Sequence, residues 1–146
     1  MKRAALLCFV ILMSFSIYGQ DQDVRGLLDQ GINLIMKKDY VKAIEVLDQA
    51  ALVNPEEAEV YAHRGQARHC LNQYKEAIED YNYAVRLQPD YAEVYHLRGL
   101  AKGDLKDNIG ACEDWEIAYE KGESRALELI VKFCQDGNDT KGKKSK

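Results

Sequence analysis

The sequence predicts an all-α protein in which three pairs of helices stack into a solenoid and a further helix caps the end. The main evidence is a repeat with a period of about 34 residues, which brings Gly31, Gly65 and Gly99 into one column. Two more columns hold only alanine and a fourth holds only large apolar residues: Ala43, Ala77, Ala111; Ala50, Ala84, Ala118; and Leu47, Tyr81, Trp115. Repetition at a fixed period of this length indicates a stack of similar supersecondary units.

The composition is that of one soluble globular domain. The chain has 146 residues, of which 47% are apolar, with 24 acidic and 20 basic side chains and only two prolines. These values exclude a largely disordered chain, a collagen-like chain and a multi-pass membrane protein. The net charge of -4 leaves no broad cationic surface, so we expect no nucleic acid partner.

Residues 1–19 have the pattern of a secretory signal peptide. Lys2 and Arg3 precede an apolar run over residues 4–18, and the chain turns polar after Gly19. The run is shorter than the roughly 20 residues that cross a bilayer as a stable helix. We therefore expect cleavage after Gly19 and export to the periplasm or the cell envelope of a Gram-negative bacterium. An uncleaved membrane anchor is the alternative.

Each period contains two amphipathic helical patterns, in units that span residues 24–57, 58–91 and 92–125. Apolar residues recur at steps of three and four, the spacing of one helix face. In the second unit they are Tyr61, Gly65, Leu71, Tyr74, Ala77, Ile78, Tyr81, Ala84, Val85 and Leu87. The glycine at place eight and the alanine at place twenty leave room for the two helices to approach closely. The large residue four places later is expected to fill the space beside them.

Residues that commonly cap helices stand before several of the predicted helices. Asn54 and Pro55 predict the start of the first helix of the second unit, because a capping residue followed by proline is typical of a helix N-terminus. Asp39 and Asn72 precede the second helices of the first two units in the same way. We therefore expect helix starts at these places.

The chain is predicted to end in a capping helix at residues 124–136 and a basic tail at residues 137–146. Four apolar residues of this helix are expected to face the stack: Leu127, Ile130, Val131 and Cys134. The tail is expected to be disordered, and its four lysines would be weakly attracted to anionic surfaces. Peripheral association with a membrane or envelope is thus among the expected contacts.

These repeats resemble those of the tetratricopeptide repeat family from Val24 to about Gln135. The family pattern of Leu, Gly, Tyr, Ala, a large aromatic residue, Ala and Pro recurs once per period, most clearly around Tyr61–Gly65 and Tyr95–Gly99. The resemblance implies a right-handed α-α superhelix of three helical hairpins. The segment from residue 111 to the last cysteine is similar to small exported bacterial members of the family.

Three departures from the family pattern fall mainly in the third unit. Asn108 replaces a tyrosine, and Glu123 replaces the closing proline. Basic residues, Arg68 and Lys102, stand at place eleven of the second and third units. These departures weaken the match of the third unit but leave its glycine and alanine columns intact.

The resemblance also implies a concave groove lined by the first helix of each pair. An extended segment or a helix of another protein is expected to bind there, because this surface is the usual working face of a solenoid. Carried over position by position, the groove residues are Arg25, Leu28, Ile32, Glu59, Ala62, His63, Gln66, His69, Glu93, His96 and Leu100. Some members of the family grip a terminal carboxylate with Lys and Asn. The matching places in the first unit hold Leu28 and Ile32, so this activity is not carried over.

No motif indicates a metal, a cofactor or a catalytic site. His63 and His69 are six residues apart and point to different sides of a helix, and His96 lies in the next unit. Cys70 follows His69 directly, but adjacent helical residues diverge. Cys70 is therefore expected to be a partly buried apolar residue rather than an activated thiol.

Adjacent carboxylates occur three times in the repeats. The pairs are Glu56–Glu57, Glu79–Asp80 and Glu113–Asp114. Neighbouring residues of a helix point to different faces, so no pair has the geometry for acid–base catalysis. We expect these carboxylates to be solvated.

Removal of the signal segment leaves three cysteines, so at least one is unpaired. In the stacked arrangement, Cys112 on the last second helix and Cys134 on the capping helix face each other, and an exported chain meets an oxidising compartment. We therefore expect a disulfide between Cys112 and Cys134. Two buried, unpaired thiols are the alternative.

These features together predict an exported, non-enzymatic scaffold that binds a protein or peptide partner in its concave groove and needs no cofactor. The alternative is a structural or accessory subunit of a bacterial cell-envelope complex that binds through its convex face. A hydrolase or thiol enzyme that uses Cys70 and His69 is a third hypothesis, and no motif favours it.

Overall fold

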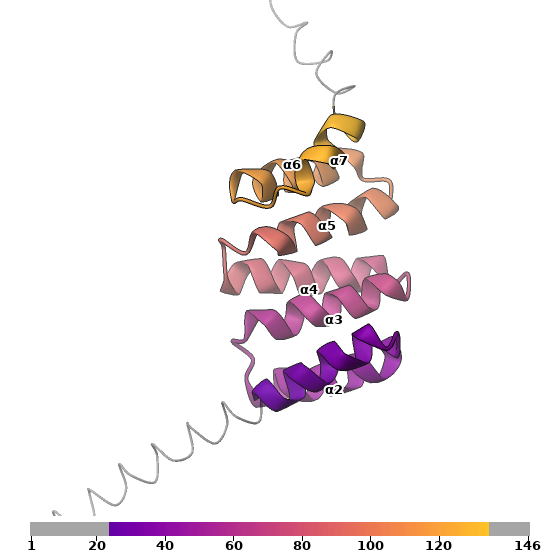
Figure 1. Cartoon of the computed structure of the whole chain (residues 1–146), viewed down its shortest axis with the longest axis vertical. Helices are drawn as coiled ribbons and strands as arrows, with labels where there is room; N and C mark the ends of the chain where they lie inside the picture. Colours follow the sequence, from indigo (N-terminus) through magenta and orange to yellow (C-terminus); the bar gives the residue numbers. More distant parts are fainter. Residues whose placement is uncertain (1–23, 135–146) are drawn as a thin grey trace, which may run out of the picture.

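The computed structural model describes residues 24–134, which form seven helices and no strand (Figure 1). The all-α fold that the sequence predicts is confirmed in this range, where no helix is long and apolar enough to cross a membrane. The predicted signal segment, the last two residues of the predicted capping helix and the basic tail lie outside the described residues. The helices are 24–36, α2 (Tyr40–Val53), α3 (Ala58–Cys70), α4 (Tyr74–Leu87), α5 (Ala92–Asp104), α6 (Asn108–Glu120) and α7 (Ala126–Phe133).

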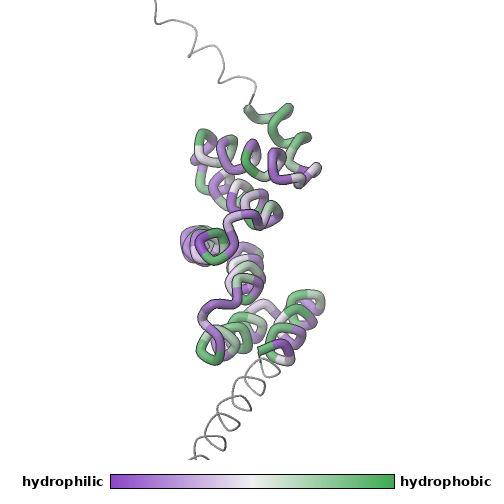
Figure 2. Tube along the Cα trace, turned by 90° about the vertical axis from the view of Figure 1, so that its left-hand side faces the viewer, coloured by the Kyte–Doolittle hydropathy of each residue, from purple (hydrophilic) through white to green (hydrophobic). Residues whose placement is uncertain are grey.

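The helices stack one above another along the long axis of the molecule (Figure 1). From α2 to α6, each helix packs against the one that follows it in the sequence, so the described residues form a solenoid of helical hairpins. Hydrophobic and hydrophilic residues alternate along the helices (Figure 2). Three apolar clusters lie between successive helices and form the core.

The small residues of the repeat lie where the two helices of a pair come closest, as predicted. A Cβ atom added to Gly65 would lie 2.7 Å from Cε1 of Tyr81, closer than real Cβ contacts. The six alanines of the repeat columns are at most 1% exposed. The three glycines and the large residues that they contact are Gly31 with Leu47, Gly65 with Tyr81, and Gly99 with Trp115. The absence of a side chain at these places therefore sets the distance between the paired helices.

The predicted capping residues do not cap the helices that follow them. α3 begins at Ala58 rather than at Pro55. The Asn54 side chain instead accepts a backbone hydrogen bond two residues further on (3.0 Å), and this turn competes with a helix start. Asp39 directly precedes α2, but its carboxylate pairs with Lys42 at 2.9 Å and makes no cap hydrogen bond. The helix starts are thus set by packing rather than by these side chains.

The turn between the two helices of each pair contains one residue with a left-handed backbone. These residues are Lys38, Asn72 and Lys106, with φ of 61°, 61° and 67°. They recur at the same period as the glycines. Asparagine tolerates this conformation better than lysine does, so the close packing of each pair, rather than a glycine, holds the turn.

α7 is shorter than the predicted capping helix and exposes part of its apolar surface. Ile130 and Cys134 pack against the cluster around α6, whereas Leu127 and Val131 are 45% and 52% exposed. The helix is largely hydrophobic, as the top of Figure 2 shows. The expectation that all four residues face the stack is wrong for Leu127 and Val131, because α6 covers only one side of α7.

The structure places Cys112 and Cys134 in the geometry of a disulfide that would join α6 to the end of α7. Their Cα atoms are 5.7 Å apart, and the two cysteines are 22 positions apart in the sequence. The bond closes the last turn of the solenoid onto the third unit. Whether the two thiols are oxidised depends on the compartment that the protein occupies, so the pairing stays a prediction.

Reduction of this disulfide is expected to lower the free energy of unfolding by about 3 kcal/mol, because the closed loop restricts the unfolded chain. Urea unfolding with and without reductant measures the effect, and a Cys134→Ser variant should show no dependence on reductant. Alkylation of the denatured, unreduced protein followed by peptide mass spectrometry tests the pairing itself. Labelling of Cys112 and Cys134 together with Cys70 would contradict it.

Candidate functional site

The predicted groove residues lie on helix 24–36, α3 and α5, and we call the surface that they share the first-helix face. A partner on this face would meet mainly those residues that the core does not use. Arg25, Glu59 and Glu93 are exposed; Ile32, His63, Gln66, His69 and Leu100 are half-buried; and Leu28, Ala62 and His96 are buried.

The first unit contributes core rather than open surface to this face. Leu28 is 7% exposed and belongs to an apolar cluster with Leu47, Ala50 and Val60. Ile32 packs against the same cluster. Leu28 and Ile32 therefore belong to the hydrophobic packing at this end of the stack, and neither side chain can bind a carboxylate.

The second and third units meet in a small hollow on the first-helix face. Ala62, His63 and Gln66 of α3 line it together with Glu93 of α5 and Tyr91, which precedes α5. Nδ1 of His63 lies 3.3 Å from Oε1 of Gln66, within the same turn of α3. The structure thus brings four of the predicted groove residues to one place, with hydrogen-bonding groups at its rim.

Carboxylates gather at the end of the first-helix face where α3 and α5 begin. Burial, together with the nearby Glu59, Glu93 and Glu57, raises the pKa of Tyr91 to about 12. Glu93 also pairs with Arg125 at 3.2 Å. Three glutamates thus lie near Tyr91, and one of them, Glu93, is paired with Arg125.

A larger cleft of about 450 Å³ opens at the other end of the face, between α5, α6 and α7. His69 and Leu100, two predicted groove residues, lie on its wall. Nε2 of His69 is 2.7 Å from Oδ2 of Asp104, and this contact joins α3 to α5 at the edge of the cleft. The sequence did not predict this cleft, because it forms where α7 departs from the repeat.

His96 is a buried histidine on the third first helix. It is 7% exposed, and its Nδ1 has no hydrogen-bond partner within the described residues. Burial and the nearby Arg125 lower the pKa of His96, while Glu123 and Glu93 act in the opposite direction. The folded protein therefore favours the neutral imidazole.

The stability of the fold is expected to decrease below about pH 6.5, the ordinary pKa of histidine, because the unfolded chain takes up a proton on His96 before the folded chain does. A His96→Gln variant removes this difference and should lose less stability between about pH 7.5 and about pH 5. Urea unfolding at both pH values measures the change. An unchanged pH dependence in the variant would contradict the prediction.

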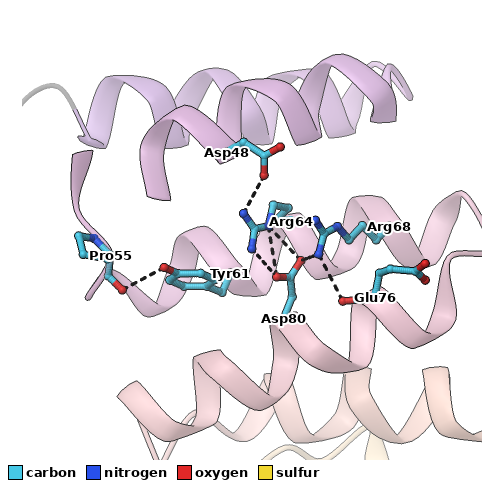
Figure 3. Close-up of polar contacts among 7 residues, drawn as sticks. All are labelled: Asp48, Pro55, Tyr61, Arg64, Arg68, Glu76 and Asp80. Carbon is cyan, nitrogen blue, oxygen red and sulfur yellow. Dashed lines mark hydrogen bonds and ion pairs between the residues drawn. The ribbon is translucent and has the colours of Figure 1, made fainter. Parts of the chain in front are cut away.

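A buried ion-pair network joins α3 to the second helices on both sides of it (Figure 3). The Arg64 guanidinium donates to Asp80 of α4 through Nε at 3.1 Å and Nη2 at 2.6 Å, and to Asp48 of α2 through Nη1 at 2.7 Å. Arg68 pairs with Asp80 at 2.9 Å. Burial raises the pKa of the Asp80 carboxyl, and the contacts with Arg64 and Arg68 oppose that rise.

The third unit repeats this network one period later. Arg98 donates to Asp114 at 2.8 Å and to Asn82 at 2.8 Å, and Lys102 pairs with Asp114 at 2.8 Å. The expectation of solvated carboxylates is wrong for Asp80 and Asp114, which are 3% and 1% exposed. The signal that would have found them is in the sequence, since the acidic and the basic members both recur at the repeat period. The basic residues at place eleven, which depart from the family pattern, are the partners of these carboxylates.

The histidines and Cys70 do not meet in one site. His69 contacts Asp104, His63 lies in the small hollow, and His96 is buried in α5. Cys70 is exposed and not partly buried as the sequence predicts, because it lies on the last turn of α3. Among residues 24–134, no group of three His, Cys, Asp or Glu side chains has the geometry to hold a metal ion.

Comparison with known proteins shows which family has this arrangement. Residues 32–102 match the family model described as tetratricopeptide repeat. No curated protein sequence matches the chain. The similarity of this chain to known proteins therefore comes from the family model and from solved structures.

Several solved tetratricopeptide repeat domains share the fold over most of their length. The first such domain of Spaghetti (RPAP3), bound to the HSP90 peptide SRMEEVD, is 25% identical, with a TM-score of 0.76 over 79% of this chain and 93% of that chain. The Sgt2 domain from Aspergillus fumigatus is 25% identical, with a TM-score of 0.72 over 85% of this chain and 87% of that chain. The TPR2B domain of yeast Sti1, in its complex with pHsp70, is 24% identical, with a TM-score of 0.75 over 79% and 98% of the two chains.

Proposed function

The chain belongs to the tetratricopeptide repeat family, and we propose that it is a non-enzymatic scaffold that binds a segment of a partner protein on its first-helix face. The observation that carries the proposal is the hollow that His63, Gln66 and Glu93 line. These polar side chains lie at the surface and do not take part in the buried ion-pair network. Similar domains with a bound peptide, such as that of Spaghetti with the HSP90 peptide, support a peptide or protein as the partner.

The partner is held by its side chains rather than by a terminal carboxylate. In the first unit, Leu28 and Ile32 lie in or against an apolar cluster and offer no cation. At the end of the face where α3 and α5 begin, Glu57, Glu59 and Glu93 add negative charge, which disfavours binding of an acidic C-terminus. The proposed partner therefore differs from the acidic HSP90 peptide SRMEEVD of the solved complex.

Capture of partners from native cell extracts tests the choice of surface. The double variant His63→Ala, Gln66→Ala removes side chains of the hollow, and we expect it to lose the partner set that the unchanged chain retains. The matched control is Leu52→Ala, Ile109→Ala on α2 and α6, where these residues are 85% and 78% exposed. We expect this control to retain the partners.

The same experiment tests the alternative, a subunit that joins an envelope complex through its second helices. Leu52 of α2 and Ile109 of α6 are exposed, so a contact through the second helices would bury both side chains. Loss of partners in the Leu52, Ile109 variant, with retention in the His63, Gln66 variant, would replace the first proposal by this one. Circular dichroism of both variants establishes that the fold is intact.

We further propose that the protein acts outside the cytoplasm, in the periplasm or at the cell envelope of a Gram-negative bacterium. The apolar run at residues 4–18 and the juxtaposition of Cys112 and Cys134 support this location. Expression in a Gram-negative host, followed by fractionation and intact mass measurement, tests it. The expected product is a periplasmic chain that begins at Gln20, and an uncleaved chain in the cytoplasm would contradict the proposal.

A further inference from the structure

The cleft between α5, α6 and α7 has the composition of a binding pocket. Its apolar lining residues include Leu100, Trp115, Leu129 and Phe133. The rings of Trp115 and Phe133 lie with their centroids 6.0 Å apart. Phe133 is 53% exposed, so one aromatic wall of the cleft is open to a bound group.

The polar residues that line the cleft include Asp104, Lys106 and Asn108, which are exposed. Asp104 is held against His69 at 2.7 Å, and Lys106 and Asn108 complete the rim. Pockets that bind organic groups typically combine an apolar floor with a few polar groups that orient the bound group. The volume of about 450 Å³ is ample for one large side chain.

The cleft is continuous with the first-helix face through α5. Leu100 and Asp104 on the C-terminal half of this helix line the cleft, and Glu93 on its first turn lies at the acidic end of the face. The eleven steps from Glu93 to Asp104 correspond to about 16 Å along a helix. An extended chain covers this distance with about five residues at about 3.3 Å each.

From these observations we propose that the cleft receives a bulky apolar side chain of an extended partner segment, and that a basic residue about five positions away pairs with the carboxylates near Tyr91. The inference rests on the proposed function and specifies the chemistry of the partner. The apolar floor selects a Leu, Met or aromatic residue, because only such a side chain covers Trp115 and Phe133 without leaving a polar group unsatisfied. The carboxylates of Glu57, Glu59 and Glu93 select Lys or Arg.

Filling the cleft without disturbing the fold provides the decisive variant. A Cβ atom at Gly103 would make ordinary contacts with Trp115 at 3.7 Å and with Ala111 at 3.9 Å, and the residue lines the cleft. Gly103→Leu is therefore expected to fold and to occupy the pocket, with a gain in helix propensity. Gly26→Leu is the matched control, since nothing lies within 4 Å of a Cβ atom there. Phe133→Ser, at an exposed position, is a second variant that removes one wall.

A phage-displayed library of random peptides, selected on the unchanged chain, is the probe. We expect the selected peptides to share a large apolar residue and a Lys or Arg about five positions from it. Trp115 is the only tryptophan of the chain, so binding should change its fluorescence. Gly103→Leu should lower the affinity for these peptides at least about tenfold, and Glu59→Lys should lower it as well. Gly26→Leu should leave the affinity unchanged.

Several outcomes would overturn the inference. Among them are the absence of any selected peptide, selection of acidic peptides or of peptides without an apolar anchor, and binding to Gly103→Leu with unchanged affinity. Occupation of the cleft by anything other than a partner segment would also overturn the inference. Trp115 fluorescence that depends on protein concentration without peptide would indicate a second copy of the chain, and fluorescence that changes on removal of residues 1–23 would indicate that segment. If the His63, Gln66 variant loses native partners but Gly103→Leu retains them, the proposed function stands and the inference fails.

Discussion

Replacement of Gly65 by leucine is expected to lower the free energy of unfolding by roughly 4 kcal/mol, a large part of the stability of a typical domain. Even a Cβ atom at this place would lie 2.7 Å from Cε1 of Tyr81 and 2.9 Å from Cδ1. Tyr81 is fully buried and cannot move aside. The two helices of the central unit would have to separate, and the units on both sides would lose their packing surface. Thermal and urea unfolding monitored by circular dichroism measure the loss.

The control for this variant is Gly26→Ala, a glycine of helix 24–36 with open space around it. Alanine there is expected to raise the free energy of unfolding by about 0.5–1 kcal/mol, because glycine is a poor helix former. The contrast between the two glycines isolates packing from helix propensity. An unchanged melting temperature for Gly65→Leu would contradict the account of the stack.

Replacement of Asp80 by alanine is expected to cost roughly 4 kcal/mol, because it removes the carboxylate that Arg64 and Arg68 share and leaves Arg64 with Asp48 alone. The side chains of Arg64 and Asp80 are 15% and 4% exposed, so solvent compensates only in part for the lost partner. Arg68 loses its 2.9 Å contact as well. Urea unfolding of the single variant, compared with the unchanged chain, measures the cost.

Two further variants separate charge from packing. Replacement of Arg64, Arg68 and Asp80 together by leucine is expected to recover most of the stability, because it removes the central charges of the buried network. The control is Asp39→Ala, which breaks the exposed ion pair with Lys42. It should leave the free energy of unfolding nearly unchanged, since salt and water screen that pair. If Asp80→Ala were as mild as the Asp39 change, the network would not hold the units together.

The buried network and the first-helix face have complementary roles. Arg64 fixes α3 against α2 and α4, so the side chains of His63 and Gln66 on neighbouring positions of α3 keep a constant place on the surface. A partner segment that binds there does not have to order the face first. A weakened network is therefore expected to reduce affinity as well as stability.

Much of the fold could be predicted because its signals are local and repeated. Gly65 and Tyr81 stand in the same relation as their counterparts one period away, and a small residue opposite a large one specifies close helix pairs. The candidate site could be predicted only in outline. The face of α3 and α5 follows from the helical period, but the burial of Leu28 and His96 depends on the neighbours that the stack supplies.

By itself, the sequence determined that the chain forms three helical hairpins, with small residues where the helices of each pair meet. Only the tertiary structure decided that Asp80 and Asp114 are buried beside arginines, that Leu127 and Val131 are exposed, and that a cleft opens beside Trp115. The physical reason is that periodicity records what each helix repeats along itself. Burial of a charge and the shape of a cleft depend instead on side chains from helices distant in the sequence, and at the end of the stack on the helix that has no successor.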